Sequence, residues 1–220
     1  MTEIPRRQFN KITKEKRILE AALVTFARLG YSAASMDAIA TEAGVSKPTV
    51  YQYFPSKQAL FTAMMASRRD DMVLAFAQDS SACMVAQLYD FACRYAETVL
   101  QPEFLSLARL IVAEAQRFPE IGQAYQASGP DRVLHSLMEF LHQLRETGRL
   151  EFDDAELAAQ DLWGLILSAP RTKALYLPDK TPTTAEVSRY INNGLAVFLK
   201  AYSSDPKTDL DTLEHLLKRQ

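Results

Sequence analysis

Residues 36–54 read MDAIATEAGVSKPTVYQYF, and this stretch decides the fold of the region around it. Ile39, Ala40 and Ala43 recur at three- and four-residue spacing, which predicts a short helix with one apolar face. Gly44 follows directly. Glycine readily takes the left-handed conformation that ends a helix and reverses the chain. The stretch therefore predicts a helix that stops at a tight turn.

A second short helix is predicted after this turn. Ser46 can cap it, as Ser35 can cap the helix before it, because a serine hydroxyl accepts a hydrogen bond from an N–H that lacks a helical partner. At about 100° per residue, Val50 and Phe54 point inward together with the stem of Lys47. The outward and flanking positions are occupied by Pro48, Thr49, Tyr51, Gln52 and Tyr53. Two helices joined in this way form a helix-turn-helix pattern.

The polar outward face suits a DNA groove. Gln and Thr side chains can contact base edges, whereas Tyr hydroxyls and Lys ammonium groups can contact phosphates. An ordinary three-helix corner with a solvated face would also show this pattern. Lys57 begins the next helix, where a cation opposes the helix dipole, so we expect an anionic partner such as phosphate. The predicted DNA-binding residues are Ser35, Ser46, Lys47, Pro48, Thr49, Tyr51, Gln52, Tyr53 and Lys57.

The run from residue 18 to residue 61 resembles the DNA-binding domain of tetracycline-repressor-type (TetR family) regulators. The matching pieces are Ala22 with Phe26, Gly30-Tyr31, Ile39-Ala40, Ala43-Gly44-Val45-Ser46, Tyr51 with Tyr53-Phe54, and Ser56-Lys57 with Leu60. Pro48 departs from the pattern, because a small residue is more usual there, although proline fits the first turn of a helix. The resemblance implies a dimeric DNA-binding regulator whose connector helix moves when a ligand binds.

The charge of the chain is segregated. Its 220 residues carry a net charge of −2, but residues 1–69 hold 11 Lys and Arg against 5 Asp and Glu, and the remainder holds 14 against 22. A basic end can meet phosphates while an acidic body stays off the DNA. No apolar run approaches the length of about 18 residues that spans a bilayer, and the N-terminus lacks the apolar core of a signal peptide. We therefore expect a cytoplasmic protein.

The sequence predicts an all-α fold. We expect an N-terminal three-helix DNA-binding domain with an N-terminal arm over residues 1–57, a connector helix over 58–79, and a helical-bundle ligand-binding and dimerisation domain over 80–220. Within that bundle, we expect Asp153 and Asp154 to cap a helix that runs to Ala169, with a break or kink at Pro170. Thr183 and Glu186 have the spacing of a capping box that begins another helix.

Two helices near the C-terminus carry more apolar surface than one small core should need. A helix that is apolar nearly all round is buried on two sides, and a second copy of the chain is the simplest second partner. Such a pairing would have twofold symmetry and predicts a palindromic operator. Burial within one subunit is the alternative. The predicted interface residues are Leu162, Leu165, Ile166, Tyr190, Ile191, Gly194, Leu195 and Phe198.

A helical bundle rich in Met, Phe and Tyr can enclose an apolar cavity. The predicted lining residues are Met65, Tyr89, Tyr95, Phe104, Ile111, Tyr125, Met138 and Trp163, and for each of them a plain core position is the alternative. Such a lining suits a small hydrophobic or amphipathic effector.

Sequence signatures of catalysis or of a cofactor are absent: there is no phosphate-binding glycine motif, HExxH, CxxC pair or GxSxG. We expect neither an enzyme nor a cofactor. The leading hypothesis is a homodimeric transcription regulator, more specifically a repressor that an effector releases from double-stranded DNA. The alternative is an all-helical carrier or sensor of small molecules that acts without DNA.

Overall fold

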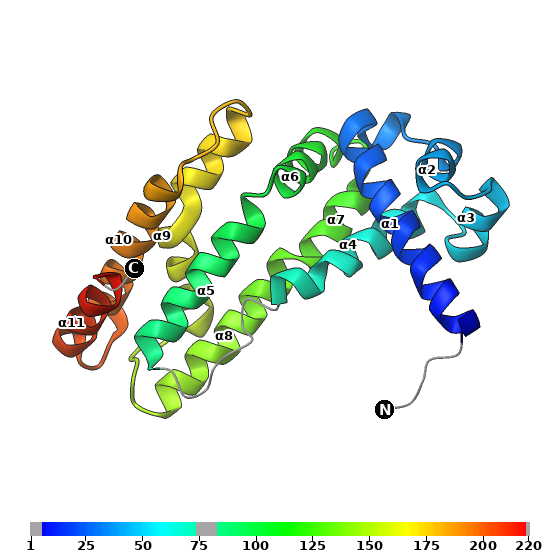
Figure 1. Ribbon diagram of the computed structural model, residues 1–220. Helices are drawn as coiled ribbons and strands as arrows, with labels where there is room; N and C mark the ends of the chain where they lie inside the picture. Colours follow the sequence, from blue (N-terminus) through cyan, green and yellow to red (C-terminus); the bar gives the residue numbers. More distant parts are fainter. Residues whose placement is uncertain (1–5, 74–82, 219–220) are drawn as a thin grey trace. The chain divides into compact units, whose positions relative to one another are not determined.

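The computed structural model describes residues 6–73 and 83–218, and every regular element in this part of the chain is a helix (Figure 1). The predicted all-α fold is confirmed. The chain divides into two compact units, each with its own core. Unit 1 holds the residues through Asp70 together with Pro102–Gly129, and unit 2 holds Asp71–Gln101 together with Pro130–Gln220.

Unit 1 is built around the long first helix, against which the second helix and the helix that begins at Pro102 pack, while the third helix packs against the second (Figure 1). Gly30 interrupts the first helix near its end with a φ of 80°, a backbone conformation that glycine adopts without strain. The helices of this unit are α1 (Arg6–Ala33), α2 (Met36–Ala43), α3 (Lys47–Tyr53), most of α4 (Lys57–Val73), α6 (Pro102–Glu114) and α7 (Pro119–Ser128).

The core of unit 1 joins segments that are distant in sequence. Phe26, Tyr31 and Phe61 have ring centroids 5.4–5.5 Å apart, and Phe118 stacks edge-on against Tyr31 at 5.1 Å. Apolar side chains of α6 and α7 enter the same cluster. The expected ranges 1–57, 58–79 and 80–220 differ from this division, because periodicity shows that a helix has an apolar face but not which core receives it. The expected boundary at residue 79 lies outside the described residues.

Unit 2 is a bundle in which α9 and α10 lie side by side (Figure 1). A Cβ atom built on Gly194 of α10 would lie only 2.7 Å from the backbone carbonyl of Leu165 on α9, so glycine permits this close approach. The helices of this unit are α5 (Met84–Val99), α8 (Pro130–Glu146), α9 (Ala155–Tyr176), α10 (Thr184–Tyr202) and α11 (Pro206–Leu217).

The ends of α9 and α10 test three sequence predictions. The capping box at the start of α10 is confirmed, since the Thr183 backbone N–H donates to Glu186 at 2.9 Å and the Glu186 N–H donates to the Thr183 hydroxyl at 3.2 Å. Asp154 caps α9 as expected. The end predicted at Ala169 is wrong: α9 continues through a buried Pro170 to Tyr176. A proline removes only one backbone hydrogen bond, and packing around its ring can retain the helix.

Within residues 6–73 and 83–218, no helix combines the length and the apolar character that crossing a lipid bilayer requires.

Candidate nucleic-acid interface

The turn between α2 and α3 has the geometry that its sequence predicts. Ser35 accepts a hydrogen bond from the Ala38 N–H at 3.1 Å and begins α2. Gly44 ends α2 in the left-handed conformation, with a φ of 62° and a ψ of 39°. Ser46 then accepts a hydrogen bond from the Thr49 N–H at 3.3 Å and begins α3. Both predicted caps are confirmed, and the role of the two serines in DNA binding remains a prediction.

Helix α3 has one buried side and one exposed side. Val50 is fully buried and Phe54 is 6% exposed, so the inward positions are those that the periodicity predicted. Tyr51, on the opposite side, remains 44% exposed. The other predicted reading residues are exposed at Pro48 and Gln52 and half-buried at Thr49 and Tyr53. The exposed side of α3 can therefore enter a groove.

Lys47, at the start of α3, is exposed and forms an ion pair with Asp37 of α2 at 2.9 Å. The hydrogen bond to Asp37 and the charge of that carboxylate raise the pKa of Lys47. The sequence placed the stem of Lys47 inward, whereas its side chain is 54% exposed. The sequence analysis did not predict Asp37 as part of this site. The sequence signal that could have found it is an acidic residue in the first turn of α2, ten residues before the lysine that begins α3.

Lys57 contacts three backbone carbonyls of its own chain, and its phosphate contact stays a prediction. Its ammonium group donates to the carbonyl oxygens of Tyr31 at 2.7 Å, Ser32 at 3.2 Å and Ala34 at 3.0 Å, and it lies 4.6 Å from the centre of the Tyr31 ring. An ammonium has three N–H donors, and all three are used here. Burial lowers the pKa of Lys57, and the negative charge of Glu114 offsets part of this shift by raising it. The Lys57 ammonium is thus held by neutral carbonyl oxygens and not by an anion.

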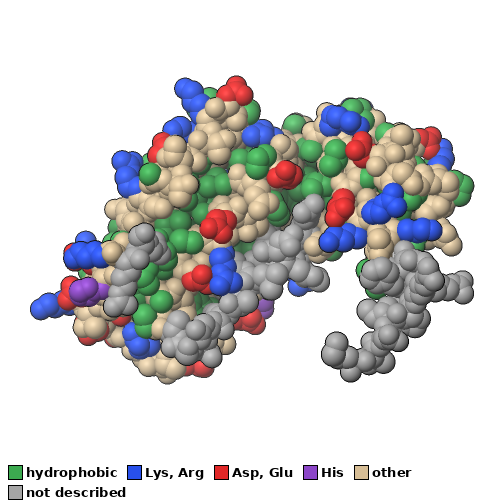
Figure 2. Space-filling view, viewed as in Figure 1, with side chains coloured by type: hydrophobic (Ala, Val, Ile, Leu, Met, Phe, Trp, Pro, Cys, Tyr) green, Lys and Arg blue, Asp and Glu red, His purple; other side chains and the backbone are tan. Residues whose placement is uncertain are grey.

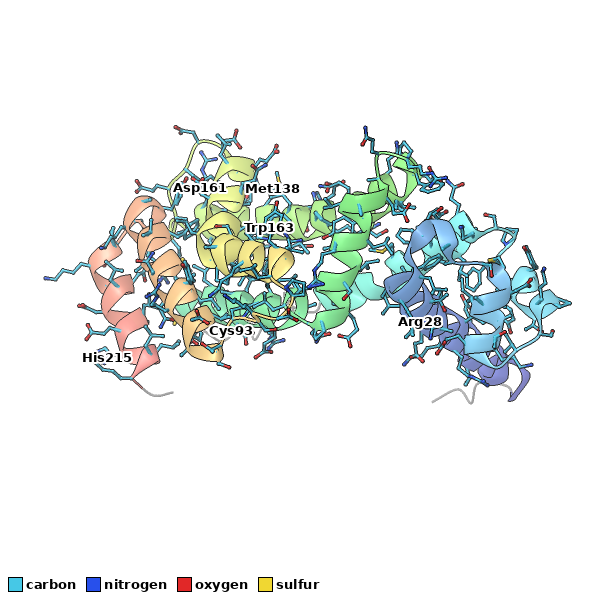
Figure 3. The ribbon with its side chains drawn as sticks, turned by 90° about the horizontal axis from the view of Figure 1, so that it is seen from above. Arg28, Cys93, Met138, Asp161, Trp163 and His215 are labelled. Carbon is cyan, nitrogen blue, oxygen red and sulfur yellow. The ribbon has the colours of Figure 1, made fainter. Side chains whose placement is uncertain are left out.

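Arg17 completes the polar contacts around the turn. Its guanidinium donates to the Ala43 carbonyl at 2.7 Å, at the C-terminal end of α2 where the helix dipole favours a cation. Arg28 of α1 pairs with Glu42 of α2 at 3.2 Å (Figure 3). Figure 2 shows acidic side chains interspersed with basic ones on the visible face of unit 1. The basic excess of this end is therefore partly used in holding the three helices together.

The eight predicted ligand-binding residues fall in both units. Met65, Phe104, Ile111 and Tyr125 belong to unit 1, and Met65 and Ile111 share its core with Tyr125. Tyr89, Tyr95, Met138 and Trp163 belong to unit 2. Their assignment to one ligand site therefore stays a prediction.

One pair among these residues is brought into direct contact. The indole N–H of Trp163 donates to the Tyr95 hydroxyl at 2.5 Å, and the two rings meet edge to face at 5.7 Å. Tyr95 also stacks on Phe91 at 5.9 Å. Figure 3 labels Trp163 on α9 and Met138 on α8, and these two helices pack against each other. These aromatic groups form a cluster inside unit 2.

The predicted dimer residues are mostly accounted for within one chain. Leu162, Ile166, Ile191, Gly194, Leu195 and Phe198 are buried by other helices of unit 2. Leu165 and Tyr190 remain half-buried. The close approach that Gly194 was expected to allow is made to α9 of the same chain. Burial of these six residues therefore does not require a second copy.

Two family models match the chain. The model for bacterial regulatory proteins of the tetR family matches residues 18–64, and the model for the C-terminal domain of AefR-like transcriptional repressors matches residues 86–204. The first covers the helix-turn-helix, and the second covers more than half of the chain.

Relatives with curated descriptions resemble the N-terminal part. The HTH-type transcriptional activator FasR of Mycolicibacterium smegmatis is 43% identical over 70 residues, which are 30% of this chain and 32% of FasR. The HTH-type transcriptional regulator RutR of Escherichia coli strain K12 is 48% identical over 52 residues, 24% of each chain. The matches thus span less than a third of the length of these two relatives.

Solved structures match over most of their length. A protein described as a TetR-family transcriptional regulator from Mesorhizobium loti MAFF303099 superposes with a TM-score of 0.78 at 31% identity, covering 87% of this chain and 98% of that one. The flavonoid-responsive regulator FrrA superposes with a TM-score of 0.73 at 34% identity, with the same two coverages.

The capped turn and the exposed side of α3 define a helix-turn-helix DNA-binding transcriptional regulator. By both family models and by its likeness to full-length structures, the chain belongs to the tetR family of bacterial regulatory proteins. The relatives are regulators of transcription and not enzymes.

Proposed function

We propose that this protein is a repressor that binds a palindromic operator as a homodimer and leaves it when a small hydrophobic or amphipathic molecule binds. The observation that carries the proposal is the exposed side of α3, where Pro48, Tyr51 and Gln52 face outward from a helix anchored by Val50. The likeness of residues 86–204 to the C-terminal domain of AefR-like repressors supports a repressing role.

A gel-shift titration tests the DNA-binding part of the proposal. The probe is the duplex DNA that flanks the gene of this protein, with a scrambled duplex of the same length as a control. We expect a saturable complex that weakens steeply with salt, because phosphate contacts release counterions. A reporter gene behind the same DNA should be silenced by the protein. Silencing identifies a repressor, whereas induction would favour the activating role that the relative FasR carries in its name.

A carrier that acts without DNA was the alternative suggested by the sequence. Such a protein would bind the flanking duplex no better than the scrambled one.

The homodimer is proposed on the outward side of α9 and α10. After the six buried residues are set aside, this side still carries Leu165 and Tyr190, and Val197 is 41% exposed. Gly164 on α9 has nothing within 4 Å of a built Cβ atom, so another surface could approach closely there. A twofold pairing of these helices would present two α3 helices to a palindromic operator.

Sedimentation analysis of single variants tests this pairing. Val197→Glu places a charge in the proposed contact and should shift the protein towards monomers. Val112→Glu is the matched control, because Val112 lies on α6 of unit 1 and is already 81% exposed. The location proposed for the interface is wrong if both variants sediment as the wild type does.

The effector proposed here is a planar aromatic or similarly hydrophobic molecule. Its support is the aromatic cluster of Phe91, Tyr95 and Trp163 and the similarity to FrrA, which is described as flavonoid-responsive. Trp163 is the one tryptophan of the chain, so its fluorescence reports on this cluster alone. Titration with flavonoids should quench or shift that fluorescence and release the operator complex, and saturated fatty acids of similar size provide the comparison.

A further inference from the structure

The ion pair between Asp37 and Lys47 joins the first turns of the two helices of the helix-turn-helix. The carboxylate and the ammonium are 2.9 Å apart, and both side chains are more than half exposed. Lys47 is the one cation in the sequence of α3. Tyr51 lies one turn further along the exposed side of the same helix. The charge that α3 could offer to a phosphate is therefore already engaged by a carboxylate of the same protein.

Other cations near the turn have different partners. Lys57 uses its three donors on backbone carbonyls, and Arg17 donates to the Ala43 carbonyl. These contacts are to neutral groups that belong to the fold. Lys47, in contrast, contacts a carboxylate, which has the charge and the acceptor oxygens of a DNA phosphate.

We propose that Asp37 is an intramolecular competitor of DNA, which holds the Lys47 ammonium in the free protein and must be exchanged for a backbone phosphate when DNA binds. This inference rests on the proposed assignment of Lys47 to a phosphate. The exchange breaks one ion pair and forms another, so Lys47 contributes less to affinity than a lysine without a partner would. Asp37 thereby lowers the affinity for every duplex, whatever its sequence.

The expected size of the effect follows from the exposure of the pair. Exposed ion pairs are weak, so the Asp37→Asn variant should bind a specific and a scrambled duplex about two- to fivefold more tightly. Its affinity should also fall more steeply with salt than that of the wild type, because no carboxylate is freed to recapture a counterion.

A double-mutant cycle separates competition from simple repulsion between Asp37 and DNA. The dissociation constants of the wild type, Asp37→Asn, Lys47→Met and the double variant are measured on both duplexes at several salt concentrations. Glu42→Gln is the matched control. It removes one carboxylate charge from α2, as Asp37→Asn does, but the cation that loses its ion pair is Arg28 of α1 and not Lys47. Thermal unfolding of each variant shows that the helices are retained.

The competition model requires Asp37→Asn to tighten binding in the wild-type background and to change it less than about 1.5-fold when Lys47 is Met. An equal gain in both backgrounds would overturn the model in favour of repulsion. Weaker binding by Asp37→Asn would overturn it as well, since Asp37 would then be positioning Lys47 for DNA. If Lys47→Met leaves affinity unchanged while the wild type binds DNA, this inference fails and the proposed function stands. If the wild type binds no duplex, the proposed function fails.

Discussion

Gly194 on α10 and Leu165 on α9 approach so closely that a Cβ atom on residue 194 would lie 2.7 Å from the Leu165 carbonyl carbon and oxygen. Backbone atoms cannot rotate away as a side chain can, so one helix would have to shift. Gly194→Ala should therefore destabilise the protein by about 1–2 kcal/mol, the cost of overpacking less the gain in helix propensity. Thermal unfolding at a fixed protein concentration measures the change.

Gly164→Ala is the control for this prediction. Gly164 also lies within α9, but nothing stands within 4 Å of a built Cβ atom there. Its substitution should be neutral or stabilise the protein by up to about 1 kcal/mol, because alanine favours the helix. Equal destabilisation by the two substitutions would show that the contact with Leu165 is not the cause.

Lys57 joins the start of α4 to the segment between α1 and α2. Lys57→Met keeps much of the side-chain volume but leaves three backbone carbonyls without their donor, and we expect a loss of about 1–3 kcal/mol of unfolding free energy. Denaturant titration measures the loss, and Lys47→Met, an exposed substitution, should stay within about 0.5 kcal/mol of the wild type. A weakening of DNA binding without any loss of stability would instead favour the phosphate contact predicted from the sequence.

These residues show which features of the structure could be predicted from the sequence alone. The caps at Ser35 and Ser46, the turn at Gly44 and the inward side of α3 are local features, so residue type and spacing were sufficient to predict them. The same reasoning predicted an anionic partner for Lys57, whereas the structure shows neutral backbone carbonyls there, and the phosphate contact stays a prediction.

Long-range packing is what the sequence did not provide. The carbonyls that bind Lys57 lie 23–26 residues away, and the Leu165 backbone that Gly194 approaches is on another helix. A pattern of apolar residues likewise predicts that a helix is buried without saying whether its own chain or a second copy buries it. The apolar faces of α9 and α10 are therefore largely accounted for within one chain, and the dimer interface on these helices stays a prediction.

Asp209 on α11 is a buried carboxylate that joins α11 to the residue that follows α10 and to the segment before α9. It accepts a hydrogen bond from the Ser203 hydroxyl at 2.6 Å and pairs with Arg149 at 3.3 Å, and its side chain is only 5% exposed. Asp209→Ala should cost about 2–4 kcal/mol, because the Ser203 hydroxyl and Arg149 lose their acceptor. Asp211→Ala, at an exposed position on the same helix, should change the unfolding free energy by less than about 0.5 kcal/mol.

Tyr202 donates a hydrogen bond to Asp161, and this contact raises the pKa of the Tyr202 hydroxyl to about 12. The folded state then holds the proton at a pH where the unfolded state has lost it. The contact should thus stabilise the fold below a pH of about 10, the ordinary tyrosine pKa, and lose that effect as the pH rises towards 12.

Ultraviolet titration between pH 9 and 11 can test this shift, since phenolate absorbs near 295 nm. Tyr202→Phe should leave the absorbance change almost unaltered in that range, because Tyr202 does not ionise there. Asp161→Asn should add the equivalent of one tyrosine. A clear decrease with Tyr202→Phe would mean that the hydroxyl ionises normally and that Asp161 does not hold its proton.

Gln52 and Lys47 should have separable effects on DNA binding if α3 reads the operator. Both are exposed on the same short helix, but a glutamine amide can pair with a base edge whereas an ammonium contacts phosphate as a point charge. Gln52→Ala should relax preference at one base position of each half-site, at a cost of about 1–3 kcal/mol for the preferred base. Lys47→Met should weaken all sequences alike and reduce the salt dependence. Competition assays against every single-base variant of a selected operator distinguish the two patterns, and identical profiles for both variants would contradict this division between base and phosphate contacts.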